Sequence, residues 1–169
     1  MSSEAVIGLG SNLGDKSANL LMAVQALSRL PGTKIRGISS IYTSAPEAPP
    51  PEDAQQEDYY NMAVKLDTGM SPMALLGACL GIESAMGRLR SVRNAARIID
   101  LDVLLYEGVK SENFELSLPH PRLLQRAFVL LPLKELYPSG RAPGIFFDPY
   151  LKEIGVAGIV QLEQRIEMG

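Results

Sequence analysis

The chain contains one run, Arg97-Ile98-Ile99-Asp100-Leu101-Asp102-Val103-Leu104-Leu105-Tyr106, in which two carboxylates alternate with aliphatic residues. Its branched and aliphatic side chains predict a β-strand that ends at Glu107-Gly108. Because successive side chains of a strand point to opposite faces, Asp100 and Asp102 share one face and lie about 7 Å apart. The opposite face is expected to pack against the core, and its residues are Ile99, Leu101, Val103 and Leu105.

Two acidic side chains on so apolar a strand are unfavourable unless something positive pairs with them. Their hard oxygen atoms suit magnesium, which keeps several waters and takes further ligands from carboxylates and phosphates. The alternative is a solvated strand face that binds nothing. We favour the metal site because arginines are dense just before the strand, at Arg88, Arg90, Arg93 and Arg97.

Length and composition indicate one globular domain over residues 1–169. Of the 169 residues, 21% are charged and 46% are hydrophobic, and the net charge is −3. This charge argues against a nucleic-acid partner, because nucleic-acid-binding domains are usually basic. We expect neither a leader nor a membrane-spanning segment, and therefore a cytoplasmic protein. The single cysteine, Cys79, and the single histidine, His120, exclude an internal disulfide and a metal site rich in thiolate or imidazole.

The order of the expected elements predicts the fold class. Residues 5–10 are typical of a strand, and an amphipathic helix follows them. Further strands are expected over 33–44 and 58–66, and a second helix between Ser71-Pro72 and Gly87. Strand, helix, strand, strand, helix, strand is the ferredoxin-like split βαβ pattern of the α+β class. We therefore expect an antiparallel sheet with two helices on one face, which leaves the other face free for ligands.

The other segments add to this unit. The pattern Gly8-x-Gly10-x-x-x-Gly14 misses the dinucleotide fingerprint, and we favour glycines that allow a tight turn between strand and helix. The alternative is that the backbone at these glycines lies near a ligand. The proline-rich loop at 46–51 suits an exposed connector and a lid over a site equally well. Extra C-terminal elements are expected as a short helix within 123–136 and a strand or helix within 150–166.

The chemistry-bearing residues surround the strand with the two aspartates. Arginine forks bind phosphate oxygens through two parallel hydrogen bonds and keep their charge. Acids and arginines around one site therefore fit a magnesium–polyphosphate complex. Tyr59, Asn61 and Phe128 are suited to a flat, hydrogen-bonding pocket for a ring. The plainer explanations are solvated arginines, a core position for Tyr59, a polar strand-face position for Asn61 and a structural role for His120.

A series of motifs follows in order along residues 5–137. They are Gly8-Leu9-Gly10-Ser11-Asn12-Leu13-Gly14-Asp15, Ser39-Ser40-Ile41-Tyr42, Asp58-Tyr59-Tyr60-Asn61, Ile82-Glu83 through Gly87-Arg88-Leu89-Arg90, Arg97-Ile98-Ile99-Asp100-Leu101-Asp102 and Leu118-Pro119-His120-Pro121-Arg122 through Arg126-Ala127-Phe128. In this set and order the chain resembles the 6-hydroxymethyl-7,8-dihydropterin pyrophosphokinases of folate biosynthesis. The resemblance implies an enzyme that transfers pyrophosphate from ATP, its co-substrate, to 6-hydroxymethyl-7,8-dihydropterin and releases AMP.

The resemblance also implies roles for single residues. Asp100 and Asp102 would bind two magnesium ions, and Arg88 and Arg97 would belong to a mobile catalytic loop. Positions that contact the nucleotide in the family match Glu83, Arg90, Val103, Ser117, His120 and Arg126. Positions of the pterin pocket match Ser44, Ala45, Tyr59, Asn61 and Phe128. Within that pocket Phe128 would stack on the ring, and Asn61 would hydrogen-bond its edge.

Two departures from the family pattern leave alternatives open. Asn94-Ala95-Ala96 stands where the family has an aromatic residue followed by Gly-Pro, and Leu80 stands where glutamine is common. One alternative is an inactive or altered-substrate ligand-binding homologue. Another is a different two-metal nucleotide transferase. We expect small-molecule substrates and no nucleic acid, membrane or obligatory protein partner.

Overall fold

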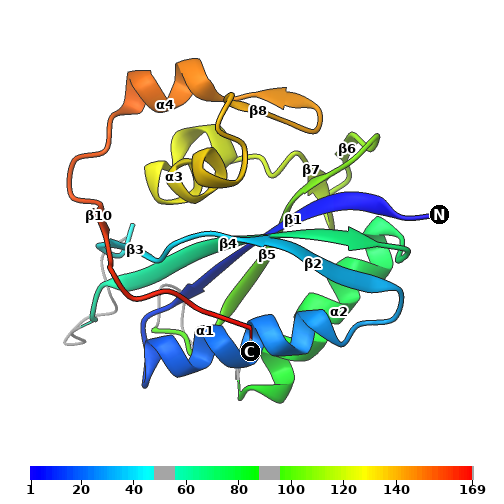
Figure 1. Ribbon diagram of the computed structural model, residues 1–169, viewed down its shortest axis with the longest axis horizontal. Helices are drawn as coiled ribbons and strands as arrows, with labels where there is room; N and C mark the ends of the chain where they lie inside the picture. Colours follow the sequence, from blue (N-terminus) through cyan, green and yellow to red (C-terminus); the bar gives the residue numbers. More distant parts are fainter. Residues whose placement is uncertain (48–55, 88–95, 169) are drawn as a thin grey trace.

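The computed structural model describes residues 1–47, 56–87 and 96–168 (Figure 1). Its strands are β1 (Ser3–Ser11), β2 (Thr33–Ile38), β3 (Tyr42–Ser44), β4 (Tyr59–Thr68), β5 (Asp100–Tyr106), β6 (Ser111–Glu112), β7 (Ser117–Leu118), β8 (Arg141–Ala142), β9 (Ile145–Phe146) and β10 (Val160–Gln161). Its helices are α1 (Lys16–Ser28), α2 (Pro72–Ala85), α3 (Ala127–Leu136) and α4 (Asp148–Ile154), with a 3-10 helix at Leu123–Gln125.

The main sheet is antiparallel, and its strands lie in the order β10, β3, β4, β1, β5, with β2 also paired to β4. Helices α1 and α2 cover one face, whereas α3 lies on the opposite face (Figure 1). The strands of the two βαβ halves therefore interleave, with β1 and β4 at the centre. This arrangement confirms the predicted ferredoxin-like α+β fold. In the described ranges, none of the helices combines the length and apolarity that a membrane span requires.

Each of the two main helices begins at a residue whose side chain caps it, and for α2 this is the predicted start at Ser71-Pro72. Asp15 caps α1 by accepting a hydrogen bond from the Ala18 N–H at 3.1 Å. Ser71 caps α2 by accepting one from the Ala74 N–H at 3.2 Å, and Pro72 follows in the first turn. Such side chains satisfy N–H groups that have no partner within the helix. The caps therefore fix where each helix leaves the sheet.

Apolar residues fill both sides of the sheet. The larger core lies under α1 and α2 and includes Leu20, Leu27, Leu75 and Cys79, all inaccessible to solvent. A second core lies under α3, with the following residues fully buried: Leu130, Leu133 and Phe147. The expectation that the second face is free for ligands is therefore wrong where α3 covers it. The apolar side of α3 has to be buried, and the sheet is the surface that buries it.

A bulge in β5 changes which way its last residues point. Val6 of β1 pairs with Leu105, but the next residue, Ile7, pairs with Val103, so Leu104 has no partner in the register. One extra residue in a strand reverses the alternation beyond it. Leu105 therefore joins Leu104 in the core under α3, and the prediction that Leu105 faces the helices with Leu101 is wrong.

The strand expected over 33–44 is also interrupted. It divides into β2 and β3 because residues 39–41 leave the regular pattern, and the register against β4 shifts by one residue between Ile38 and Tyr42. At the break, the Ala63 N–H donates to Ser39 Oγ at 2.9 Å, where a regular strand would offer a carbonyl oxygen. A side chain thus replaces the backbone as partner, which no alternation of apolar residues predicts.

The C-terminal segment crosses from one face of the sheet to the other. After α4 the chain returns as β10, pairs with β3 and ends beside α1 (Figure 1). A cluster at Glu135 of α3 holds this segment in place. The carboxylate accepts hydrogen bonds from the Ser40 N–H at 2.9 Å and the Tyr42 hydroxyl at 2.8 Å, and it pairs with Arg165 at 2.9 Å. Burial opposes the charge of Glu135, but these hydrogen bonds outweigh burial and hold its pKa below the ordinary value.

We expect Glu135→Gln to lower the free energy of unfolding by about 1–3 kcal/mol at pH 7, because it removes a charge-assisted acceptor shared by three partners. A carboxylate with a depressed pKa stabilises the fold above its unfolded pKa, and this stabilisation is lost as the pH falls through the folded pKa. The difference between wild type and variant should therefore shrink below about pH 4. Urea unfolding at several pH values measures it. Glu153→Gln, at an exposed position of α4, is the control, and an equal loss in both variants would contradict the assignment.

Candidate active site

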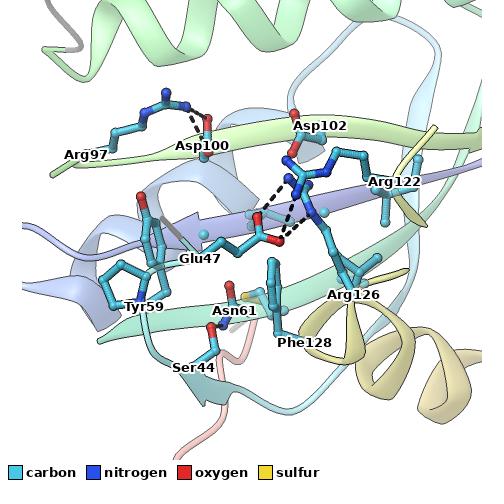
Figure 2. Close-up of a pocket in the computed structure, with 18 of the residues that line it drawn as sticks. Ser44, Glu47, Tyr59, Asn61, Arg97, Asp100, Asp102, Arg122, Arg126 and Phe128 are labelled. Atoms are coloured by element: carbon cyan, nitrogen blue, oxygen red, sulfur yellow. Dashed lines mark hydrogen bonds and ion pairs between the residues drawn. The ribbon is translucent and has the colours of Figure 1, made fainter. Parts of the chain in front are cut away.

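A pocket of about 570 Å³ opens where α3 leaves the sheet uncovered, above β1, β4 and β5 (Figure 2). The predicted site residues that line it are Ser44, Ala45, Tyr59, Asn61, Arg97, Asp100, Asp102, Arg126 and Phe128. These residues come from distant parts of the chain, and the sheet brings them together. The pocket therefore gathers most of the residues that the sequence analysis singled out.

Two glycines of β1 form part of the pocket lining. Gly8 pairs with Asp102 and Gly10 pairs with Asp100 in the register of β1 and β5. A Cβ atom on Gly8 would lie 3.1 Å from the side chain of Leu104, and one on Gly10 would lie 3.4 Å from Tyr59. Both glycines thus leave space beside the carboxylates, and both lie inside a strand. The prediction that the glycines of this pattern serve a tight turn is wrong for Gly8 and Gly10. Of the three glycines in the pattern, only Gly14, with a φ of 74°, adopts the left-handed conformation.

The two aspartates reach the pocket from alternate positions of β5, as predicted. Asp100 accepts two hydrogen bonds from Arg97 Nη1, at 2.9 and 3.1 Å. Burial and the neighbouring Asp100 raise the pKa of Asp102 to about 6, although Arg126 partly opposes the shift. Two carboxylates thus lie close together, and the ionised form of one of them is disfavoured. A divalent cation bound beside them would stabilise the ionised forms of both.

The carboxylate oxygen atoms of Asp100 and Asp102 would fit part of the coordination shell of a magnesium ion. In the described ranges no three or more histidine, cysteine, aspartate or glutamate side chains gather at one metal-binding point. Magnesium commonly takes one or two carboxylates from the protein and completes its octahedron with water and substrate phosphates. Asp100 and Asp102 supply that number of carboxylates, and Arg97 would have to share Asp100 with the ion.

Guanidinium groups lie beside the aspartates in the pocket, together with an acid that the sequence analysis did not single out. Glu47 lies after β3 and reaches into the pocket toward Arg122 and Arg126 (Figure 2). Its carboxylate forms a two-pronged pair with Arg126, at 2.8 Å to Nη2 and 3.1 Å to Nε. Arg122 Nη2 approaches the same carboxylate at 3.5 Å. Arg122 belongs to the Pro-His-Pro-Arg motif and was identifiable from it, whereas nothing in the sequence places Glu47 here.

The remaining wall suits a flat ring. Asn61 Nδ2 donates to Ser44 Oγ at 2.8 Å and to the Tyr42 carbonyl at 3.0 Å, and both bonds are buried. These bonds use both protons of the amide nitrogen, so Asn61 presents its oxygen, which faces Gly10. Phe128, from the first turn of α3, stands beside Asn61 (Figure 2).

Some predicted residues do not line the pocket. Val103 is buried in the helix-side core, and Glu83 is buried where its carboxylate accepts a hydrogen bond from the Leu101 N–H at 2.7 Å. Ser117 donates to the Asn113 carbonyl at 3.0 Å. His120 Nδ1 accepts a hydrogen bond from the Arg122 N–H at 3.3 Å, and burial together with Arg126 and Arg122 lowers its pKa. Arg88 and Arg90 lie outside the described residues, as do Arg93, Asn94 and Ala95 of the same segment.

Asn12 is a further residue that the sequence analysis did not single out. It is 1% exposed, and it makes a closed pair with Arg97: its N–H donates to the Arg97 carbonyl at 3.0 Å, and its Oδ1 accepts from the Arg97 N–H at 2.8 Å. Its Nδ2 donates to Gln56 Oε1 at 3.1 Å and to the Glu57 carbonyl at 3.3 Å. One buried amide therefore joins the segment before β5 to the segment before β4, on either side of the pocket.

Comparisons with known proteins identify the family of the chain. The family model of 7,8-dihydro-6-hydroxymethylpterin-pyrophosphokinase (HPPK) matches residues 6–138. A 2-amino-4-hydroxy-6-hydroxymethyldihydropteridine pyrophosphokinase of Methylorubrum extorquens is 42% identical over 94% of this chain and 98% of its own length. One of the same name from Bacillus subtilis is 40% identical over 80% of this chain and 79% of its own. The wild-type HPPK-DHPS of Plasmodium falciparum shares the fold, with a TM-score of 0.65 and 16% identity over 91% of this chain and 44% of that one.

The fold and the pocket define a ferredoxin-like transferase whose site combines paired carboxylates with arginines, as enzymes of phosphorylated substrates do. The match over most of the chain makes the assignment specific. The chain belongs to the 7,8-dihydro-6-hydroxymethylpterin-pyrophosphokinase family.

We expect Asn12→Ala to lower the free energy of unfolding by about 2–3 kcal/mol, because it leaves the Arg97 N–H without its acceptor in a buried place. Chemical denaturation measures the change. Asn113→Ala is the matched control, because Asn113 Oδ1 also accepts a backbone N–H, that of Glu115, but in an exposed turn. If both variants lose the same small amount, Asn12 does not hold the two segments.

Proposed function

We propose that this protein transfers the pyrophosphoryl group of ATP to 6-hydroxymethyl-7,8-dihydropterin with the help of magnesium. One observation supports this most strongly. A single pocket presents paired carboxylates and arginines on one side, and an amide oxygen with an aromatic ring on the other. The first side suits a metal-bound polyphosphate, and the second suits a flat heterocycle with N–H donors.

The nucleotide side is assigned from the charges. Asp100 and Asp102 would hold magnesium, which when bound neutralises phosphate charge and orients the phosphate groups. Arg126 and Arg122 would bind phosphate oxygens through their forks. His120, which lies near Arg122 and Arg126, would also contact the nucleotide. Its lowered pKa keeps the imidazole neutral at pH 7, so it would act as a hydrogen-bonding group and not as a cation.

The pterin side is assigned from shape and hydrogen bonding. Asn61 Oδ1 would accept from the N–H groups at one edge of the ring, because its amide nitrogen already serves Ser44 and the Tyr42 carbonyl. Phe128 would stack on one face of the ring, and Tyr59 would close the end of the pocket beside Asp100. The substrate hydroxymethyl group would then point toward the carboxylates.

The reaction itself is a displacement at phosphorus. The hydroxymethyl oxygen attacks the β-phosphorus of ATP, and the bond from that phosphorus to the oxygen that bridges to the α-phosphate breaks. AMP leaves with the bonding electrons, and the proton of the attacking hydroxyl is released to solvent water. Since phosphoryl transfer requires little covalent chemistry from the protein, positioning and charge neutralisation are what these residues supply.

We expect Asp102→Asn to reduce the rate of AMP formation at least about a hundredfold, because the variant weakens the metal site that neutralises the transferring group. Chromatography of the products after incubation with ATP, magnesium and 6-hydroxymethyl-7,8-dihydropterin measures it. Asp67→Asn is the control, because Asp67 pairs with Arg36 at an exposed place away from the pocket. Release of ADP or of free pyrophosphate by the wild type would contradict the proposed reaction.

We expect Phe128→Ala to weaken pterin binding roughly tenfold or more, because stacking and buried ring area are lost together. Calorimetric titration with 6-hydroxymethyl-7,8-dihydropterin in the presence of a non-hydrolysable ATP analogue measures it. Phe114→Ala is the matched control, since Phe114 is fully exposed in the turn between β6 and β7. Equal affinities of the Phe128 variant and the wild type would remove the ring from this position.

A further inference from the structure

Glu47 occupies the place in the pocket where an anionic ligand would meet the arginines. Its carboxylate binds Arg126 through two nitrogen atoms, at 2.8 and 3.1 Å, and lies 3.5 Å from Arg122. The pair is partly sheltered, with Arg126 16% exposed and Glu47 36% exposed. The same fork of N–H groups is what a phosphate group would bind, so a phosphate and this carboxylate compete for Arg126.

The position of Glu47 depends on that pairing. The carboxylate projects toward the wall that carries Asp100 and Asp102, and three acids around one cavity repel one another (Figure 2). Arg126 also faces Asp102, whose ionised form it favours. The position of Glu47 is therefore stable only while its carboxylate can pair with Arg126 and Arg122.

We propose that Glu47 is an intramolecular competitor for the polyphosphate group: it holds Arg126 and Arg122 until a phosphorylated ligand displaces it. The inference rests on the proposed function for the nature of the ligand. Displacement separates a guanidinium from a carboxylate and pairs it with a phosphate, so the net affinity is the difference between the two pairings. Glu47 thereby weakens the binding of every ligand that uses Arg126. A ligand with few phosphate groups loses the largest share of its affinity, because it makes fewer contacts besides those with Arg126.

Glu47→Gln tests this competition, because it keeps the shape of the side chain and removes its charge. The probe is inorganic triphosphate in magnesium-containing buffer, titrated by calorimetry. We expect the variant to bind roughly tenfold more tightly than the wild type, the size that a partly sheltered ion pair supports. The gain should shrink as salt is raised, because salt screens the pairing.

Glu57→Gln is the matched control. It removes the same charge at residue 57, where the side chain is 70% exposed and lies 3.8 Å from Lys16 Nζ. We expect less than a twofold change there, which separates local competition from net charge. Thermal unfolding of each variant checks the fold, and Glu47→Ala provides a second substitution at the same position.

Inorganic triphosphate carries neither adenine nor a group that the pterin assay detects, so its outcome does not depend on catalysis. Tighter binding by the Glu47 variants supports the competition even if no AMP is formed. Unchanged or weaker binding overturns it even if AMP is formed, because Glu47 would then be neutral toward the anion or help to orient Arg126 for it. Equal gains in the Glu47 and Glu57 variants would overturn it as well.

Discussion

The pairing of β1 with β5 is the constraint on which the site depends. It sets Gly8 opposite Asp102 and Gly10 opposite Asp100, so that each carboxylate faces a position without a side chain. In an antiparallel pair, directly opposed side chains lie within about 5 Å, and any larger residue there would fill the space beside the acids. Neighbouring side chains already limit that space, since Leu104 and Tyr59 close in on the two glycines. The pocket exists because this register leaves part of the sheet uncovered by side chains.

The bulge at Leu104 separates the polar and apolar parts of the same sheet face. Before it, β5 presents Asp102 to the pocket, and after it Leu104 and Leu105 both turn toward α3. Strict alternation would have placed Leu105 with the helix-side core and weakened the contact with α3. The extra residue therefore adds Leu105 to the apolar contact with α3 on one part of the face. The other part of the face remains open as the pocket. Phe128, which lines the pocket, comes from the first turn of that same helix, so its position follows from the apolar contact behind it.

Local patterns in the sequence were sufficient for the elements and for the fold class. Period-2 and period-3.6 patterns, with the cap at Ser71, predict the strand and helix order correctly. The break between β2 and β3 was not predictable, because it depends on Ser39 bonding to Ala63 and on Ser40 bonding to Glu135 of a distant helix. Bulges are equally hidden, since one inserted residue leaves composition unchanged.

The site was predictable as far as residue types and motifs identify chemistry. Acids, arginines and the ring-binding wall could be named because their side chains have specific ligand preferences. Glu47 and Asn12 could not, because each acts through partners that only the folded chain brings near: Arg126 for Glu47, and Arg97 for Asn12. The role of the β1 glycines is also hidden in the sequence, because a glycine that allows a turn and a glycine that leaves space in a pocket look the same there.

The charges of the pocket explain why acids and arginines occur together. Among the described lining residues, Glu47, Asp100 and Asp102 face Arg97, Arg122 and Arg126. The arginines alone would attract any small anion, and the aspartates alone would hold a cation that no substrate needs. In the structure the two kinds of charge pair with each other, Arg97 with Asp100 and Arg126 with Glu47. Only a ligand that supplies both an anion for the arginines and a cation for the aspartates can replace both pairs at once. A metal-bound polyphosphate, the ligand proposed for this site, has that composition, and the two ion pairs would therefore favour it over a free anion or a free cation.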